Sequence, residues 1–274
     1  MKVGLIIIGD EILSGKRQDK HLGKFISLLA ARGMSLDWAQ YLGDDRAHIA
    51  AQLRLAFASG DLVISCGGIG ATPDDHTRQA AAAALERELE LHPQAQELIW
   101  QRIQMTAAEQ GETAQAQSPD TLRRFEMGVF PIGAEIIPNP YNKIPGFYVG
   151  SVYFVPGFPV MAHPMMEWVL DQRYPQLHRA VGVQEKSMIV QGAMEASLTP
   201  LMVAVETQFP GIKVFSLPSV DHPQWGRHIE LGVKAAAANE SGHADAAERL
   251  EAAYSTLKTG VLQFGAAVSS ELVR

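Results

Sequence analysis

The sequence predicts an α/β fold with three α/β/α layers around a mostly parallel sheet, and a small α+β domain after it. Three short apolar runs in the first quarter of the chain alternate with segments of helical periodicity. This alternation indicates βαβ units, whose parallel strands are covered by helices on both faces. Near residue 181 the succession of strand-like and helix-like segments changes to that of a smaller unit with both α and β structure. We therefore expect one domain over residues 1–175 and a second over residues 181–274.

The first third of the chain supplies three strand and helix pairs. The run from Val3 to Ile8 is continuously apolar, which suits a central parallel strand buried on both faces. Gly33 ends the helical pattern that follows, because glycine takes the left-handed conformation found after helices. The expected strands are 3–8, 36–42 and 62–66, and the expected helices are 22–29, 49–57 and 79–91.

The remaining two thirds of the chain begin with helices and end in the smaller unit. Pro93 opens a helix, and Ser118 and Pro119 have the residue types of a helix cap and a first helical position. The segment from Pro131 to Pro159 is rich in proline and glycine, encloses two short strands and leads into another helix. The further strands are expected at 147–149, 152–155, 188–190, 213–217 and 228–233, and the further helices at 119–125, 196–208 and 244–258.

Composition and charge exclude several classes of protein. The 274 residues are 47% hydrophobic, enough for one large or two modest domains, and the net charge of −7 argues against nucleic-acid partners. With Cys66 as the single cysteine and no closely spaced histidine pair, the sequence excludes a disulfide and a soft metal site. No apolar stretch has membrane-spanning length, and no secretion signal precedes the first strand. We expect a cytoplasmic protein without a membrane partner.

The run from Asp61 to Thr77 carries the strongest functional signal. An apolar strand leads into Gly67-Gly68-Ile69-Gly70, where the absence of a Cβ lets the backbone approach a ligand closely. The next helix aims free N–H groups and its positive dipole end at this turn, which favours a phosphate. Asp74 and Asp75 stand where a phosphate-bound cation needs oxygen ligands. The pattern is neither a P-loop nor a dinucleotide fingerprint. The alternative is a structural turn with Asp75 as the helix cap.

Acidic residues also follow the first and second predicted strands. Asp10 and Glu11 follow the first, and Asp44 follows the second. Open α/β sheets bind ligands beyond the carboxyl ends of their strands, so these side chains and the glycine turn are expected around one crevice. Each has a plainer alternative: Asp44 and Asp45 can cap the next helix, and Glu11 can be a solvated loop residue.

Five motifs occur in order along the chain. They are Ile8 to Gly15, Leu42-Gly43-Asp44, Gly67 to Thr77, Asn139-Pro140 with Pro145-Gly146, and Pro156-Gly157-Phe158-Pro159. Together they resemble the motifs of the molybdopterin-binding-like domain of the MoaB/MogA type. More closely than the MoaB/MogA type, the chain resembles the N-terminal part of the competence/damage-inducible protein A (CinA) family, over nearly its whole length. That family's C-terminal amidase domain has no counterpart in the sequence.

This resemblance implies a small-molecule ligand and the residues that hold it. In the family, the glycine loop and acidic residues hold the diphosphate of a nucleotide or pterin with a divalent metal. CinA-type domains are associated with metal-dependent hydrolysis of ADP-ribose, and MogA-type relatives adenylylate molybdopterin. The implied metal ligands and catalytic carboxylates are Asp44 and Asp75, with Mg, Mn or Co as the metal. The implied phosphate and ligand contacts are Gly67, Gly68, Gly70, Thr72, Asp74, Thr77, Glu11, Asp10, Asn139, Lys143, Pro145 and Gly146.

The chain departs from the family pattern near the implied site. Ala71 replaces a proline, His21 replaces an asparagine, and Asn142-Lys143-Ile144 replaces Gly-Thr-Ala. The bulkier residues would narrow or reshape the site. Lys143 is either a charge for a phosphate or a plain surface lysine.

Three functions of different classes remain. The first, which we expect, is a metal-dependent hydrolase of a nucleotide diphosphate, an ADP-ribose pyrophosphatase-like enzyme whose metal activates a water. The second is a molybdopterin or nucleotide carrier without turnover. The third is a degenerate domain kept for contacts in a homo-oligomer. Phosphate release separates the first from the others, and stabilisation by a ligand separates the second from the third.

Overall fold

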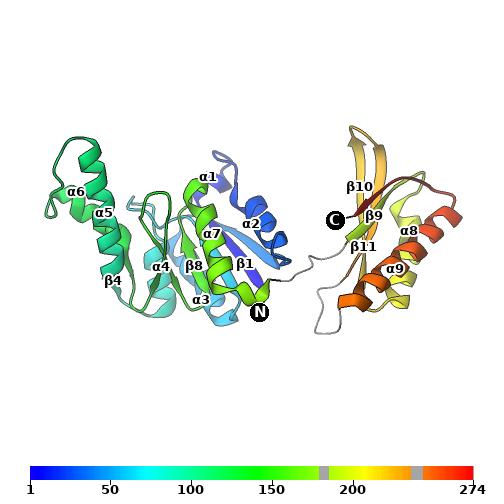
Figure 1. Ribbon diagram of the computed structural model, residues 1–274, viewed down its shortest axis with the longest axis horizontal. Helices are drawn as coiled ribbons and strands as arrows, with labels where there is room; N and C mark the ends of the chain where they lie inside the picture. The colour runs from blue at the N-terminus through cyan, green and yellow to red at the C-terminus, as the bar shows by residue number, and fades with distance from the viewer. Residues whose placement is uncertain (179–184, 236–242, 274) are drawn as a thin grey trace. The chain divides into compact units, whose positions relative to one another are not determined.

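The computed structural model describes residues 1–178, 185–235 and 243–273 (Figure 1). It divides into two compact units, Met1–Arg179 and Ala180–Arg274, each with a hydrophobic core. The predicted start of the second domain, residue 181, lies outside the described residues. None of the helices among the described residues combines the length and the apolar character needed to cross a membrane.

A mixed, mostly parallel sheet forms the centre of the first unit. Within the described residues it has six strands in the order β2-β1-β3-β8-β7-β6. The first four are parallel to their neighbours, and β7 and β6 extend the sheet through antiparallel pairs. The predicted fold class is confirmed. The strands are β1 (Val3–Ile8), β2 (Trp38–Leu42), β3 (Leu62–Cys66), β6 (Glu135–Ile137), β7 (Gly146–Val149) and β8 (Val152–Val155).

Helices cover both faces of this sheet. Leu5 and Ile7 of β1 pack into the hydrophobic cluster that includes α2 and α7, whereas Ile6 and Ile8 pack into the cluster that includes α3 and α4. All four side chains are buried. Two covered faces therefore explain why the run from Val3 to Ile8 is apolar throughout. The helices are α2 (His21–Ala30), α3 (Arg46–Ser59), α4 (Thr77–Leu85) and α7 (Pro159–Arg173).

The remaining elements of the first unit lie beside the sheet. α5 and α6 lie side by side (Figure 1), and buried side chains of both helices belong to one small apolar cluster. Ser118 caps α6, because its Oγ accepts the N–H of Thr121 at 3.2 Å, and Pro119 is the first helical residue. This confirms the predicted roles of both residues. The elements are α1 (Asp10–Leu13), β4 (Leu89–Leu91), α5 (Pro93–Glu109), α6 (Pro119–Phe125), η1 (Glu126–Gly128), β5 (Val129–Pro131) and η2 (Pro175–Leu177).

The second unit has the order β-α-β-β-α-β. Its described strands form an antiparallel sheet in the order β10-β11-β9-β12, which is the ferredoxin-like arrangement. Side chains of both helices share one core with the sheet, among them Leu198 of α8 and Leu257 of α9. The elements are β9 (Glu185–Gln191), α8 (Glu195–Gln208), β10 (Ile212–His222), β11 (Gly226–Ala235), α9 (His243–Gln263) and β12 (Ala267–Val273).

The predicted helix over residues 79–91 is wrong in its second half. Glu86 takes the left-handed conformation, with φ 54°, and ends the helix. The N–H of Arg87 then donates to the Ala82 carbonyl at 3.0 Å, which closes the turn in the manner of a Schellman motif. Leu89 and Leu91, read as the end of the helix, instead belong to β4.

Replacing Glu86 with glycine is expected to raise the free energy of unfolding by about 0.5–1 kcal/mol. Glycine adopts the left-handed conformation without the steric cost of a Cβ. Glu88→Gly is the control, because Glu88 has no positive φ and gains nothing from glycine. Urea denaturation of both variants measures the effect. A loss of stability in Glu86→Gly would contradict this explanation of the helix end.

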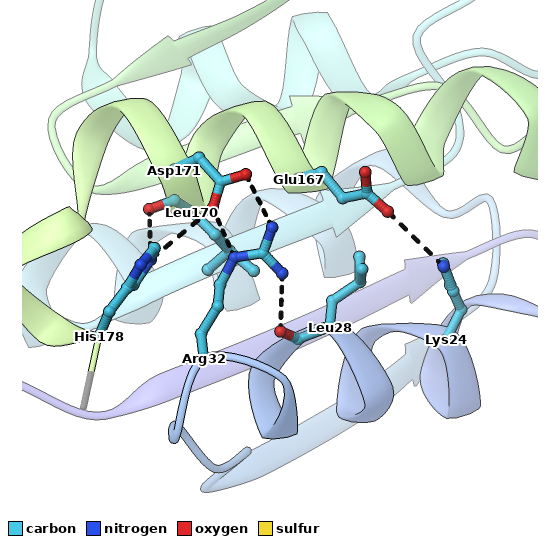
Figure 2. A network of polar contacts seen from close by, with 7 residues as sticks. All are labelled: Lys24, Leu28, Arg32, Glu167, Leu170, Asp171 and His178. Atoms are coloured by element: carbon cyan, nitrogen blue, oxygen red, sulfur yellow. Dashed lines mark hydrogen bonds and ion pairs between the residues drawn. The ribbon is translucent and has the colours of Figure 1, made fainter. Parts of the chain in front are cut away.

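A polar network joins α2 to α7 (Figure 2). Arg32 Nε and Nη2 donate to the two carboxylate oxygens of Asp171 at 2.6 and 2.8 Å. This bidentate contact holds the pKa of Asp171 below its usual value. At the other end of the two helices, His21 Nε2 donates to the carbonyl of Gly157 at 3.0 Å. The helix pair therefore fixes the turn that precedes α7.

Candidate functional site

A cleft of about 530 Å³ lies along the edge of the sheet where the parallel strands end. Residues after β2, β1, β3 and β8 line it, together with the loop between β6 and β7. The strand order places these segments next to one another, from Asp44 through Glu11 and the glycine loop to residues 156–158 and the loop 139–145. This is the position that open α/β sheets use for ligands.

Thr77, the first residue of α4, holds the carbonyl groups of the glycine loop. Its Oγ1 donates to the carbonyl oxygen of Gly67 at 3.0 Å, and its N–H donates to that of Gly68 at 2.9 Å. Thr77 is fully buried. Its hydroxyl therefore shapes the loop from behind and is not available to a ligand.

Arg78 holds the next part of the loop. It is only 5% exposed, and its Nη2 donates to the carbonyl oxygen of Gly70. Burial lowers the pKa of Arg78, while the nearby carboxylate of Asp75 acts in the opposite direction. A buried cation thus lies against the loop, and nothing in the sequence pattern pointed to it.

The amide groups of the same loop are left free. The N–H groups of residues 68–71 have no hydrogen-bond acceptor among the described residues. All four residues line the cleft. Successive backbone amides without acceptors form a concavity suited to an anion.

Asp75 organises this loop and does not cap α4. Its Oδ2 accepts the N–H of Thr72 at 2.8 Å and also the Thr72 hydroxyl. The N-cap position of α4 belongs to His76, which makes no side-chain capping bond. A Cβ on Gly70 would collide with Asp75 Oδ2, so glycine is needed for this approach. The capping alternative for Asp75 is therefore wrong.

Asp44 and Asp10 hold each other's backbone. The N–H of Asp10 donates to Asp44 Oδ2 at 2.9 Å, and the N–H of Asp44 donates to Asp10 Oδ1 at 3.2 Å. Burial raises the pKa of Asp44, and the negative charges of Asp10, Glu11 and Asp74 raise it further. Asp45 caps α3, as predicted, whereas Asp44 does not, so the capping alternative is confirmed for Asp45 and wrong for Asp44.

Replacing Asp44 with asparagine is expected to stabilise the free protein at neutral pH, by less than about 1 kcal/mol. The raised pKa means that the folded state disfavours the charged carboxylate, so ionisation weakens the fold as pH rises through that pKa. Asparagine removes this penalty and keeps an oxygen that can accept the Asp10 N–H. The gain should be present at pH 7 and vanish below about pH 4, the ordinary pKa of aspartate. Thermal melting against pH measures it, and a gain that persists in acid would show that the charge of Asp44 is not its cause.

Comparison with known proteins identifies the family of the first unit. The family model described as "Probable molybdopterin binding domain" matches residues 4–179. The chain belongs to this family. The motif-based resemblance to MoaB/MogA and CinA N-terminal domains is thereby confirmed.

Individual relatives agree with this assignment. A protein of Caldivirga maquilingensis is 31% identical over 208 residues, which cover 74% of this chain and 75% of that protein. A CinA-like protein of Anaeromyxobacter sp. (strain K) is 30% identical over 74% of this chain, but the match spans only 49% of that protein's length. The crystal structure of CinA, "with unknown function", from Thermoplasma acidophilum matches 65% of this chain and all of that chain, with 25% identity and a TM-score of 0.51.

Most of the site residues expected for a domain of this family line the cleft. They are Glu11, Asp44, Gly67, Gly68, Gly70, Thr72, Asp74, Asp75, Asn139 and Pro145. Asp10, Thr77, Lys143 and Gly146 do not. Thr77 is buried behind the glycine loop, and Asp10, which is exposed, accepts the N–H of Asp44. Gly146 is buried in β7, where a Cβ would collide with the carbonyl of Phe154, so it serves strand packing.

Lys143 is directed to α5 and not into the cleft. Its Nζ donates to Gln101 Oε1 at 3.4 Å, and its backbone has φ 66°. The loop around it is closed by Asn139, whose Nδ2 donates to Asn142 Oδ1 at 2.8 Å and to the Ile144 carbonyl at 2.9 Å. A role for Lys143 in binding phosphate therefore does not agree with its placement.

Sequence reasoning missed several residues of the cleft, above all Arg17. Arg17 is exposed and is the one positively charged side chain among the described residues that line the cleft. Its N–H donates to the carbonyl of Glu11 at 2.9 Å, which brings the segment after α1 back over the site. The signal that could have found it is its place in the same post-strand segment as Glu11. Met127, Phe158 and Met161 also line the cleft and were not among the expected contacts.

The carboxylates of the cleft do not form a complete metal site by themselves. Among the described residues, no group of three or more His, Cys, Asp or Glu side chains is arranged to hold a cation. Asp44 and Asp75 each use Oδ2 in loop hydrogen bonds, and each has an Oδ1 without a partner among the described residues. A divalent cation at this position would need oxygens from the ligand as well, as Mg²⁺ often does at phosphate sites.

Proposed function

We propose that the cleft binds the phosphate group of a small pterin or nucleotide compound. The observation that supports this best is the run of amides at residues 68–71, which line the cleft and have no acceptor among the described residues. A phosphate oxygen is the acceptor that such a loop accommodates. Membership of a probable molybdopterin binding family favours the pterin or nucleotide class.

The cleft has an excess of negative charge, so a phosphate ligand needs a cation to bind there. Its lining includes the carboxylates of Glu11, Asp44, Asp74 and Asp75, against the guanidinium of Arg17. A phosphate alone would be repelled by this negative excess at short range. In the proposed complex, a divalent cation enters with the ligand, and the free Oδ1 atoms of Asp44 and Asp75 supply part of its shell. Arg17 supplies a second positive charge for the phosphate.

That the protein hydrolyses its ligand stays a prediction. Hydrolysis of a nucleotide diphosphate such as ADP-ribose would use the same phosphate loop and the same cation. None of the relatives described above carries the name of a hydrolase. Binding of a molybdopterin-type ligand without turnover is the alternative that the family favours.

Isothermal titration with inorganic pyrophosphate, with and without Mg²⁺, tests the binding proposal. We expect binding when Mg²⁺ is present and little or none without it. Asp44→Asn should weaken the Mg²⁺-dependent binding by about tenfold or more, because a charged oxygen ligand is lost. Asp221→Asn, an exposed change in the second unit, is the control and should have no effect. Failure of pyrophosphate to bind in both conditions would contradict the proposal.

The same preparation can decide whether turnover occurs. Incubation with ADP-ribose and Mg²⁺, Mn²⁺ or Co²⁺, followed by a coupled phosphatase assay, detects the hydrolysis products. Hydrolysis of ADP-ribose by the wild type that is lost in the Asp44→Asn variant would support a hydrolase. Tight binding of pyrophosphate without release from ADP-ribose would favour the carrier.

A further inference from the structure

Phe158 is an exposed aromatic ring on a fixed backbone at the cleft. Its side chain is 56% exposed, and the residue lines the cleft. Pro156 and Pro159 flank the turn, and each restricts φ to a narrow range. The carbonyl of Gly157 is held by His21 Nε2 at 3.0 Å. The ring is therefore presented to the cleft with little loss of backbone freedom on binding.

The turn that carries Phe158 lies against the glycine loop. The N–H of Gly67 donates to the carbonyl of Val155 at 3.0 Å, and a Cβ on Gly157 would lie 3.5 Å from Gly67 Cα. β3 and β8 are neighbours in the sheet, and neighbouring strands are about 5 Å apart. Phe158 is thus one strand away from the loop with the free amides.

The cleft changes character along the sheet edge. Asp44, Glu11 and Asp75 lie on the side of β2, β1 and β3. Beyond β3, on the side of β8 and β7, the lining carries no charged side chain: apolar side chains such as Met161 and Ile144 stand beside two asparagines. A ligand that spans the cleft is therefore expected to be ionic at one end and uncharged at the other.

We propose that Phe158 is the platform on which a flat, uncharged aromatic ring of the ligand stacks. The phosphate of the same molecule then occupies the amides of residues 68–71. This inference rests on the proposed phosphate binding and adds the residue that recognises the flat ring of the pterin or nucleotide, with a ligand of mononucleotide size. Stacking on a phenylalanine selects for a flat π-system and not for one particular base, since every such ring offers a face.

Tyr141 shows what an exposed ring without this role looks like. It is 63% exposed on the neighbouring loop 139–145, yet it does not line the cleft. Single exposed apolar side chains are common on protein surfaces and need no ligand to explain them. Phe158 differs from Tyr141 in facing the same cavity as the free amides. Tyr141→Ala is therefore the matched control.

Titration of the full chain with four probes in the presence of Mg²⁺ tests the inference. AMP and FMN carry rings, whereas ribose 5-phosphate and inorganic pyrophosphate do not. Phe158→Ala is expected to weaken binding of AMP and FMN by about 5- to 100-fold, the usual effect of losing a stacked ring. It should leave the ringless probes unchanged. Phe158→Trp should keep the tight binding of AMP and FMN, and Tyr141→Ala should change nothing.

The possible results separate this inference from the proposed function. Equal weakening of all four probes by Phe158→Ala, or no weakening of any, would overturn the role of the ring. If the wild type binds ringless and ring-bearing probes equally well, the inference fails and the proposed phosphate site stands. If it binds none of the four, both fail. An unchanged melting temperature for Phe158→Ala and Phe158→Trp shows that the variants are folded.

Discussion

Replacing Gly67 with alanine is expected to lower the free energy of unfolding by about 3 kcal/mol and to abolish phosphate binding. Gly67 has φ 103°, and a Cβ at this position would collide with the carbonyl oxygen of Ile8. Strained backbone costs about 1–3 kcal/mol, and overpacking costs a further 1–3 kcal/mol. The atom that must move belongs to the backbone at the end of β1. Relief of the collision therefore displaces β1 or the glycine loop, both of which line the cleft.

Gly60→Ala is the control that separates strain from collision. Gly60 has φ 69°, and a Cβ there would meet no atom within 4 Å. The variant should lose about 1 kcal/mol from left-handed strain alone and bind pyrophosphate normally. Urea denaturation and pyrophosphate titration of both variants measure the two effects. Equal losses of stability at the two positions would show that contact with β1 is unimportant.

Replacing Arg78 with methionine is expected to lower the free energy of unfolding by about 2 kcal/mol and to weaken pyrophosphate binding. Methionine fills similar space, but the Gly70 carbonyl loses its charged donor, and a polar group left unpaired costs about 1–3 kcal/mol. The negative charge of Asp75 also loses its buried counter-charge. The loop should then hold its amides less firmly for a phosphate.

Arg87→Met provides the comparison for Arg78. Arg87 Nη1 also donates to a carbonyl, that of Ile132 at 3.0 Å, but Arg87 is exposed. Water can replace its donor, so the loss of stability should stay below about 1 kcal/mol, with normal binding. If Arg78→Met were as mild as Arg87→Met in both assays, Arg78 would not organise the loop.

The sheet was predictable because burial on two faces leaves a clear pattern. β1 and β3 are apolar at every position but Gly4 and Ser65, and both are central strands. The position of the cleft followed from the same pattern, since parallel strands bring their carboxyl ends to one edge. β12 was not predicted, because four of its seven residues are exposed and its sequence lacks an apolar run.

The roles of individual polar residues were harder to predict than their location. Asp75 has the residue type and spacing of a helix cap, yet its carboxylate bonds to Thr72 because the loop folds back on itself. Lys143 lies between two residues that line the cleft, but its left-handed backbone sends the side chain to Gln101. Arg78 is a long charged residue of a type that is mostly exposed, whereas here it is buried against Gly70. These outcomes depend on backbone conformation and tertiary contacts, which spacing alone does not encode.

A crystal structure of the protein with AMP and Mg²⁺ would show whether the glycine loop and Phe158 hold one ligand between them. We expect phosphate oxygens about 2.7–3.2 Å from at least two amide nitrogens of residues 68–71. We also expect the adenine ring to stack on Phe158. A phosphate bound elsewhere, with the amides of residues 68–71 contacting only solvent, would rule out the proposed binding mode.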